Sequence, residues 1–274
     1  MVTELDYMEY ANDAAAQAAY VNNGGINDAY TKLLLHLDAL AFTDESGKSV
    51  TNTGVTLDTT NKVFGAGSAY FNGVSTYLQL ADSDDWNFGS GDFTINFRIR
   101  WITLTNASVM GQDEGGGSHL KWMVNWNAVS ANHMSFHFQN PAGTSYVVAW
   151  SWIPSTGIFY DCEIDRQGNN WYFFVNGTQT GETQTQSAAV PDVSAPLTIG
   201  TDGEAYCWHV GNLDEIRISK GIARHTSNFS SPTSAFAPLQ SYSEATIKTQ
   251  GSYSLKAIAA ITDSLNKTLT RTIA

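Results

Sequence analysis

The sequence predicts an all-β protein in which two antiparallel sheets pack into a sandwich. Aromatic residues make up 12% of the 274 residues, and large flat side chains of this kind fill the space between packed sheets. Short segments alternate apolar and polar residues, which is typical of strands with one buried face. Gly- and Asn-rich turns separate these segments and helical periodicity is nearly absent, so an all-β sandwich is favoured.

Residues 1–30 differ from the rest of the chain and predict an N-terminal arm. Residues 6–20 are rich in helix formers, and residues 22–25 read Asn-Asn-Gly-Gly, which is a strong helix stop. We expect a short helix or an adaptable arm here. Such a segment is too small to fold alone, so it must dock on its own domain or on a neighbouring subunit.

Residues 31–238 read as many short strands. Apolar residues alternate with Thr, Asn and Arg along residues 93–100, a second alternating segment spans residues 171–176, and a third contains Ile216 and Ile218. Turn-forming sequences separate the strands: Gly65-Ala66-Gly67, Asn72-Gly73, Gly115-Gly116-Gly117, Gly168-Asn169-Asn170 and Asn176-Gly177. An Asn-Gly pair supports the positive φ of a two-residue hairpin turn. This part of the chain therefore forms the body of the sandwich.

Residues 239–274 predict a further β segment. Alternate residues between 253 and 259 are apolar, and Leu269 and Ile273 share a face of a second expected strand. A lone hairpin is marginal in water. We therefore expect these residues to begin a second domain or to form an inter-subunit strand pair.

The charge balance excludes several classes of partner. The net charge is −12, from 14 Lys and Arg against 26 Asp and Glu, and no basic cluster interrupts the acidic chain. We expect no nucleic-acid binding.

The longest apolar runs fall short of a transmembrane helix, so no membrane insertion is expected. The first residues lack the basic and apolar regions of a secretory signal.

The chain has two cysteines, Cys162 and Cys207. They could be buried thiols that act as small hydrophobic side chains. Alternatively, they could form one disulfide between neighbouring strands.

Three stretches of the sequence, taken in their order along the chain, carry a resemblance to a known family. Residues 34–47 read LLHLDALAFTDESG, residues 64–73 read FGAGSAYFNG, and residues 211–226 read GNLDEIRISKGIARHT. Together with the hairpin expected at residues 159–177, they resemble the laminin-G-like group of the concanavalin-A-like lectin and glucanase superfamily. The resemblance covers residues 31–238 and implies an antiparallel two-sheet jelly roll. Residues 6–20 and 242–256 resemble pieces of phage-type structural proteins, which more weakly implies a virion component.

The resemblance raises the possibility of glycoside hydrolysis, which we do not expect. Glucanases of this superfamily use a Glu-x-Asp-x-x-Glu pattern on one strand to supply two catalytic carboxylates. Glu163 and Asp165 begin such a pattern, but Gly168 stands where the second Glu should be. The chain is therefore expected not to be an enzyme. Glu163 and Asp165 should line the solvent face of a strand, while Cys162 and Ile164 point inward.

Two acidic loops are candidates for a calcium site. Relatives of this fold often hold Ca²⁺ between rim loops through carboxylate and carbonyl oxygens. Here residues 112–117 contribute Asp113 and Glu114, and residues 201–204 contribute Asp202. The alternative is that these are solvated acidic loops without a metal. Asp214 and Glu215, beside Arg217, could likewise either fix the edge of a sheet or face a ligand.

Sugar binding would require an exposed aromatic ring beside amide and hydroxyl groups. The candidates are Trp122, Trp126, Trp150 and Trp152. Trp150 and Trp152 are two residues apart and share a strand face, so both should be buried or both exposed.

These observations predict a non-catalytic structural or assembly subunit of a virion fibre, such as a phage tail fibre, or of an extracellular filament. Residues 1–30 and 239–274 would connect identical subunits in self-assembly, because neither segment can bury its apolar face alone. The jelly roll would recognise glycans or a host surface. The alternative is a soluble or cell-surface lectin-like carbohydrate-binding module. Either protein would act on a virion or outside the cell.

Overall fold

The computed structural model describes residues 29–115, 118–202 and 207–236. The strands are β1 (Thr31–Leu35), β2 (Val50–Thr53), β3 (Thr56–Asp58), β4 (Ser68–Asn72), β5 (Tyr77–Leu80), β6 (Phe93–Trp101), β7 (Ala107–Asp113), β8 (Lys121–Trp126), β9 (His133–Gln139), β10 (Ser145–Ser151), β11 (Phe159–Gln167), β12 (Asn170–Val175), β13 (Thr178–Gln179), β14 (Gln184–Thr185), β15 (Leu197–Ile199) and β16 (Val210–Lys220). A single 3₁₀ turn, η1 (Asp84–Trp86), accompanies them within these residues. The expected N-terminal arm and C-terminal β segment lie almost wholly outside the described residues. None of the described helical structure is long and apolar enough to cross a membrane.

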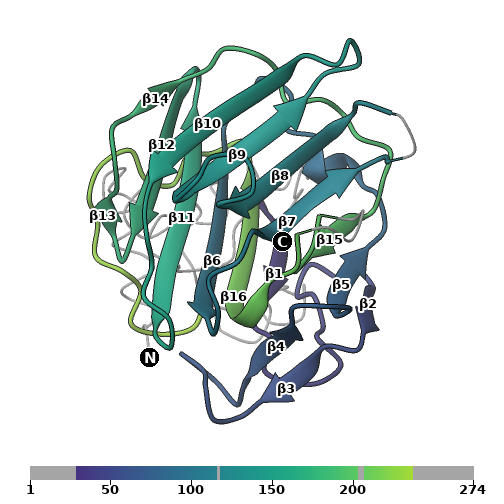
Figure 1. Cartoon of the computed structure of the whole chain (residues 1–274), viewed down its shortest axis with the longest axis vertical. Helices are drawn as coiled ribbons and strands as arrows, with labels where there is room; N and C mark the ends of the chain where they lie inside the picture. The colour runs from purple at the N-terminus through teal and green to yellow at the C-terminus, as the bar shows by residue number, and fades with distance from the viewer. Residues whose placement is uncertain (1–28, 116–117, 203–206, 237–274) are drawn as a thin grey trace, which may run out of the picture.

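The strands form two antiparallel sheets, which confirms the predicted sandwich. The first sheet has nine strands in the order β13-β12-β11-β6-β16-β4-β3, with β1 beside β16 and β14 beside β12. The second sheet has seven strands in the order β10-β9-β8-β7-β15-β5-β2. In Figure 1 strands β7 to β10 of the second sheet lie in front of β6 and β16 of the first. Sequence neighbours pair within β7 to β10, whereas β6 lies between β11 and β16. This arrangement is a jelly roll.

The core lies between the sheets and follows the alternation seen in the sequence. Phe93, Ile95, Phe97 and Ile99 of β6 are all fully buried. Their neighbours in the core are largely aromatic: the Phe93 and Trp171 rings meet edge to face with centroids 5.3 Å apart. Burying one such side chain stabilises the fold by roughly 1.5–3 kcal/mol. A core of this kind explains the high aromatic content.

Strand β16 changes its neighbour halfway along, at a bulge. Residues Val210 to Leu213 pair with β4, whereas Ile216 to Ser219 pair with β1. The register against β6 shifts between Asp214 and Arg217, and Glu215 has a φ of 47°. The bulge lets two short strands share one edge of β16.

Residues 221–236, which follow β16, run across the outer face of the first sheet, and we call them the covering segment (Figure 1, yellow-green). The Arg224 amide donates to Asp165 on β11 at 2.8 Å, and the Phe229 amide donates to the Gly177 carbonyl at 2.8 Å. Gly177 has a φ of +75°, and a Cβ there would lie 2.2 Å from the Phe229 carbonyl oxygen. The Asn176-Gly177 turn therefore both closes a hairpin and lets the covering segment approach.

Candidate functional site

An open hollow of about 540 Å³ lies at one rim of the sandwich, and we call it the rim hollow. Its lining comes from the start of β8, the β9–β10 turn and the link between β14 and β15: Leu120, Asn140, Pro141, Tyr146, Ala188, Ala189, Pro191 and Asp192. The turn that joins β9 and β10 lies at the upper right of Figure 1. Its volume falls within the range of roughly 300–1,000 Å³ that small-molecule sites occupy.

The β9–β10 turn has a local structural cause. The side-chain oxygen of Asn140 accepts hydrogen bonds from the Ala142 and Thr144 amides at 3.1 and 2.9 Å. Gly143 supplies the φ of +80° that the turn needs. The Asn140 oxygen is therefore used within the turn. Its amide nitrogen donates to the Tyr146 hydroxyl at 3.5 Å, and both residues line the rim hollow.

The Tyr146 ring is held in place from behind. It stacks on Phe138 with centroids 5.0 Å apart and an interplanar angle of 18°, and Phe138 stacks on Trp171 at 6.2 Å and 14°. A fixed aromatic ring can pack against the C–H face of a sugar. The Asn140 amide can donate to sugar hydroxyls, and the Asp192 carboxylate can accept from them. This is the combination of apolar wall and few polar groups that orients a small ligand.

The wall contributed by the β14–β15 link rests on a buried arginine. Arg166 is fully buried and donates to the Ala188 carbonyl at 3.3 Å and to the Gly89 carbonyl at 2.9 Å. Its guanidinium also lies over the Trp171 ring, 5.0 Å from the ring centroid. One core ring, Trp171, thus supports both the Tyr146 side and the Ala188 side of the rim hollow.

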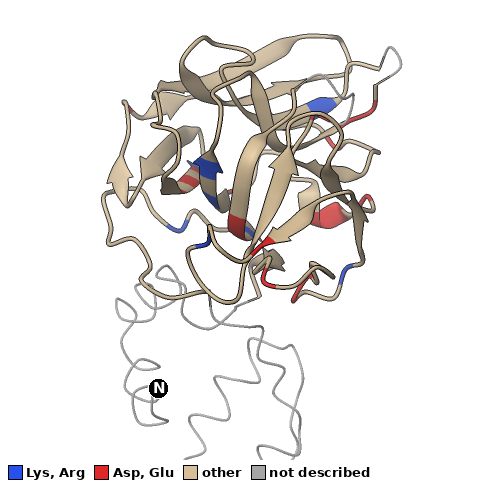
Figure 2. Ribbon diagram, turned by 60° about the horizontal axis from the view of Figure 1, so that its bottom comes forward, with Lys and Arg blue, Asp and Glu red and all other residues tan. Residues whose placement is uncertain are grey.

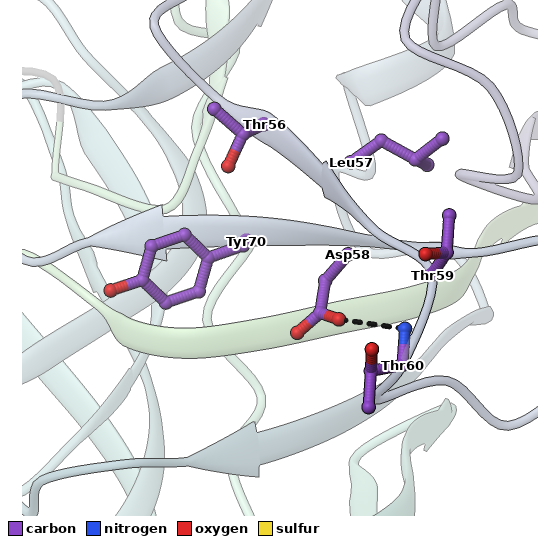
Figure 3. Close-up of a pocket in the computed structure, with 6 residues that line it drawn as sticks. All are labelled: Thr56, Leu57, Asp58, Thr59, Thr60 and Tyr70. Atoms are coloured by element: carbon purple, nitrogen blue, oxygen red, sulfur yellow. Dashed lines mark hydrogen bonds between the residues drawn. The ribbon is translucent and has the colours of Figure 1, made fainter.

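A second hollow, of about 400 Å³, lies at β3 and β4 and is lined by Thr56, Leu57, Asp58, Thr59, Thr60 and Tyr70. Figure 3 shows the Asp58 carboxylate between the Tyr70 ring and the Thr60 amide, which donates to it at 2.9 Å. Asn61 and Asn212 also donate to this carboxylate. Burial raises the pKa of Asp58, but these hydrogen bonds outweigh it and lower the pKa to about 2. The carboxylate is thus occupied by the protein, so the rim hollow is the better candidate.

The structure corrects the predicted tryptophan platform. Trp122, Trp126 and Trp150 are buried in the core, so none of them presents a ring face to solvent. Trp152 is half-buried and packs edge to face against Trp101 at 5.4 Å. The aromatic residue at the rim hollow is Tyr146, which the sequence reasoning missed. Its position just after the Asn140-Pro141 turn was the available signal.

The three predicted calcium ligands do not come together. Asp113 pairs with Lys121 at 2.9 Å, and Glu114 accepts from the Ser194 amide at 3.0 Å. Strand β15 runs antiparallel to β7, so Asp202, which follows β15, lies toward the first residue of β7, Ala107. Asp113 is the last residue of β7, so the two aspartates lie toward opposite ends of that strand. Among the described residues, no group of three or more His, Cys, Asp or Glu side chains could hold a metal ion.

The two cysteines, both within the described residues, are free thiols, so the disulfide alternative is wrong. Cys162 is fully buried on the core side of β11, and burial raises the pKa of its thiol well above its usual range. Cys207 is only partly buried, and burial raises its pKa to about 11. Both thiols therefore stay protonated near neutral pH.

Glu163 and Asp165 do point away from the core, as predicted, but neither lies at the solvent. The covering segment buries both carboxyl groups. Glu163 lies 2.6 Å from Nδ1 of His225 and accepts from Asn96, while Asp165 accepts from Thr94 at 2.5 Å. Burial raises the pKa of Glu163 to about 7 and raises that of Asp165 well above its usual range. The pair anchors the covering segment.

Asp214 and Glu215 also make contacts within the protein. Asp214 accepts from the Val63 amide at 2.8 Å. Glu215 accepts from the Phe236 amide at 2.8 Å and lies 2.8 Å from Nδ1 of His36. Both carboxylates are therefore buried in contacts within the protein, but they lie in the middle of β16, an interior strand, so the expected place at the edge of the sheet is wrong.

Antiparallel two-sheet jelly rolls of this kind occur in viral capsid proteins and in lectin domains. Residues 71–225 match the family described as the concanavalin A-like lectin/glucanases superfamily, and the chain belongs to this family. The matched residues include every residue that lines the rim hollow. No curated protein matches the chain in sequence.

Solved structures share the fold at low sequence identity. Domain 4 of AbnA, a GH43 extracellular arabinanase from Geobacillus stearothermophilus, in complex with arabinotriose, has a TM-score of 0.56 at 13% identity over 72% of this chain and 95% of that domain. The binding domain of Paraclostridial Mosquitocidal Protein 1 has a TM-score of 0.54 at 13% identity over 71% of this chain and 50% of that one. The receptor binding domain of botulinum neurotoxin D has a TM-score of 0.54 at 12% identity over 74% of this chain and 51% of that one. The chain thus spans about half the length of these toxin binding domains, and identities this low establish the fold alone.

Proposed function

We propose that this chain is a non-catalytic recognition module that binds carbohydrate at the rim hollow and acts outside the cell or on a virion. The observation that carries the proposal is the Tyr146 ring, fixed by Phe138 and flanked by the Asn140 amide and the Asp192 carboxylate. An aromatic wall beside a few polar groups suits a sugar ring, which has an apolar face and polar edges.

Two further observations support a binding role over a catalytic one. Glu163 and Asp165, the nearest match to a glucanase pair, are buried beneath the covering segment. Among the structural neighbours, the arabinanase domain is a separate domain seen with arabinotriose, and the toxin domains are named for binding.

A glycan array that includes arabinotriose and other neutral oligosaccharides tests the proposal, followed by titration calorimetry on the glycans that bind. Tyr146→Ala should weaken binding at least tenfold, because the aromatic wall of the rim hollow is lost. Tyr77→Ala is the matched control, since Tyr77 is a half-buried tyrosine on β5 whose ring contacts Trp208. Binding that survives Tyr146→Ala, or an array with no bound glycan, would overturn the proposal.

A second proposed function is assembly, as a subunit of a virion fibre or extracellular filament. It is favoured by apolar side chains at the other end of the sandwich, where Ile102, Ile153 and Ile158 are 44%, 64% and 51% exposed. Exposed apolar side chains that gather at one end of a domain are typical of protein contact surfaces.

Size-exclusion chromatography with light scattering tests the assembly role. The double variant Ile153→Asp/Ile158→Asp and a deletion of residues 1–28 should each shift the protein toward monomer if these parts join subunits. Val74→Asp is the control, because Val74 is also exposed, at 70%, but lies in the β4–β5 turn. An oligomeric state unchanged by both alterations, or a monomeric parent protein, would refute the assembly role.

A further inference from the structure

We propose that the rim hollow selects uncharged sugars and rejects anionic ones such as sialylated or sulfated glycans. This inference rests on the proposed carbohydrate-binding function and names the ligand class of that site. It follows from the charges that line and surround the rim hollow.

The lining itself carries one charged side chain, and that charge is negative. Asp192 is exposed on the β14–β15 link, and the remaining lining residues are apolar, amide or phenolic. A carboxylate can accept hydrogen bonds from the hydroxyl groups of a neutral sugar. The same carboxylate repels the carboxylate of a sialic acid or a sulfate group.

Two basic side chains beside the rim hollow, Lys121 and Arg166, are already used by the protein, whereas the exposed His119 imidazole lies next to Gly143 of the β9–β10 turn. Lys121, at the start of β8, pairs with Asp113 at 2.9 Å. Arg166 is fully buried behind the Ala188 backbone and donates to carbonyl oxygens, with its Nε 2.8 Å from the Gly168 oxygen. Asp113 neutralises the charge of Lys121, and Arg166 has no exposed surface, so neither of these two cations favours an anionic ligand at the rim hollow.

The wider surroundings add negative charge. Glu114 is held next to the same link by the Ser194 amide, at 3.0 Å. The chain as a whole has a net charge of −12, and Figure 2 shows how few Lys and Arg residues its ribbon carries. Distant charges are screened by salt, so the nearby Asp192 carboxylate should dominate.

The expected loss of affinity for an anionic sugar depends on how close its negative charge comes to the Asp192 carboxylate. Two like charges about 4 Å apart in bulk water repel strongly enough to weaken binding about fivefold, and more where the surroundings are less polar. A sialylated glycan whose carboxylate comes this close to Asp192 should therefore bind about fivefold more weakly than its neutral counterpart.

The test uses an array that displays each neutral oligosaccharide beside its sialylated and sulfated counterparts. Calorimetry then compares the bound pairs, with lactose and 3′-sialyllactose as a standard pair. The neutral member should bind more tightly, and Asp192→Asn should shrink the difference within a pair. Asp82→Asn is the control for net charge, because Asp82 lies outside the lining.

The outcomes separate this inference from the proposed function. Binding of neither member of any pair would overturn the carbohydrate-binding function itself. Equal or tighter binding of the anionic members, in a protein whose binding is lost in Tyr146→Ala, would overturn only the selection of uncharged sugars. A preference for neutral members that is unchanged in Asp192→Asn would also overturn it, because the preference would then have another cause.

Discussion

Replacing Glu163 with glutamine tests whether the buried carboxyl group beneath the covering segment holds a proton in the folded protein. Glutamine keeps the size of the side chain and cannot ionise. In the native protein this carboxyl group lies 2.6 Å from Nδ1 of His225 and accepts from Asn96, whose own oxygen accepts from Arg217 at 3.0 Å. Burial raises the pKa of Glu163 from 4.5 to about 7.

The sign of the pH effect follows from this raised pKa. Between pH 4.5 and 7 the folded protein binds the proton of Glu163 more tightly than the unfolded chain does. The stabilisation from the protonated group is therefore fully present below pH 4.5 and is lost as the pH rises through 7. The difference between the two pKa values corresponds to about 3 kcal/mol.

The wild-type stability curve alone cannot reveal this effect, because buried histidines act in the opposite direction. Burial lowers the pKa values of His209 and His225 from 6.5 to about 4. The folded protein therefore binds fewer protons than the unfolded chain in that window, and these groups add stability as the pH rises from 4 to 6.5. The difference in stability between wild type and Glu163→Gln cancels the contribution of His209, whereas His225 contacts Glu163 and contributes to the difference.

The assay is urea denaturation of both proteins at intervals between pH 4.5 and 8. The stability of Glu163→Gln relative to wild type should increase with pH by up to about 3 kcal/mol across this range. Glu182→Gln is the control for the change in net charge, since Glu182 is exposed on the link between β13 and β14. A difference that does not change with pH would mean that Glu163 is ionised throughout, and the argument from burial would fail.

Three further predictions concern the covering segment, the thiols and the proposed metal. Gly177→Ala should destabilise the protein by at least about 2 kcal/mol, because its Cβ would collide with the covering segment. Gly168→Ala, at a φ of +58° with open space around the Cβ, should cost less in the same denaturation assay. In the native protein a thiol reagent should modify Cys207 first and reach buried Cys162 only on unfolding, so equal rates would contradict the burial. We expect EDTA to leave glycan binding unchanged, because the carboxylates at residues 112–117 are engaged by the protein, and a loss of binding restored by Ca²⁺ would instead assign a calcium site there.

The sandwich could be predicted because its cause is local. Alternation along β6 places Phe93, Ile95 and Phe97 on one face, and that pattern is visible in nine consecutive residues. The tryptophan platform could not be judged in the same way. Trp150 shares the inward face of its strand with Val148, but the residue type alone suits both a core and a sugar-binding surface.

The burial of Glu163 and the position of the rim hollow depend on contacts between distant parts of the chain. Alternation correctly placed Glu163 and Asp165 on the face opposite Cys162. Only the return of the covering segment, some sixty residues later, removes that face from solvent. The rim hollow likewise combines Leu120, Tyr146 and Asp192 from three separate segments. Such juxtapositions depend on topology, which residue patterns do not specify.

The bulge in β16 has a mechanical consequence. The backbone of β1 hydrogen-bonds to the residues just after the bulge, and the Glu215 carboxylate holds both His36 and the Phe236 amide. The entrance and the exit of the described domain are therefore fastened to one strand. A pull applied through the chain on either side would load β16 and its bulge directly, while the sheet that carries the rim hollow would remain outside the line of force.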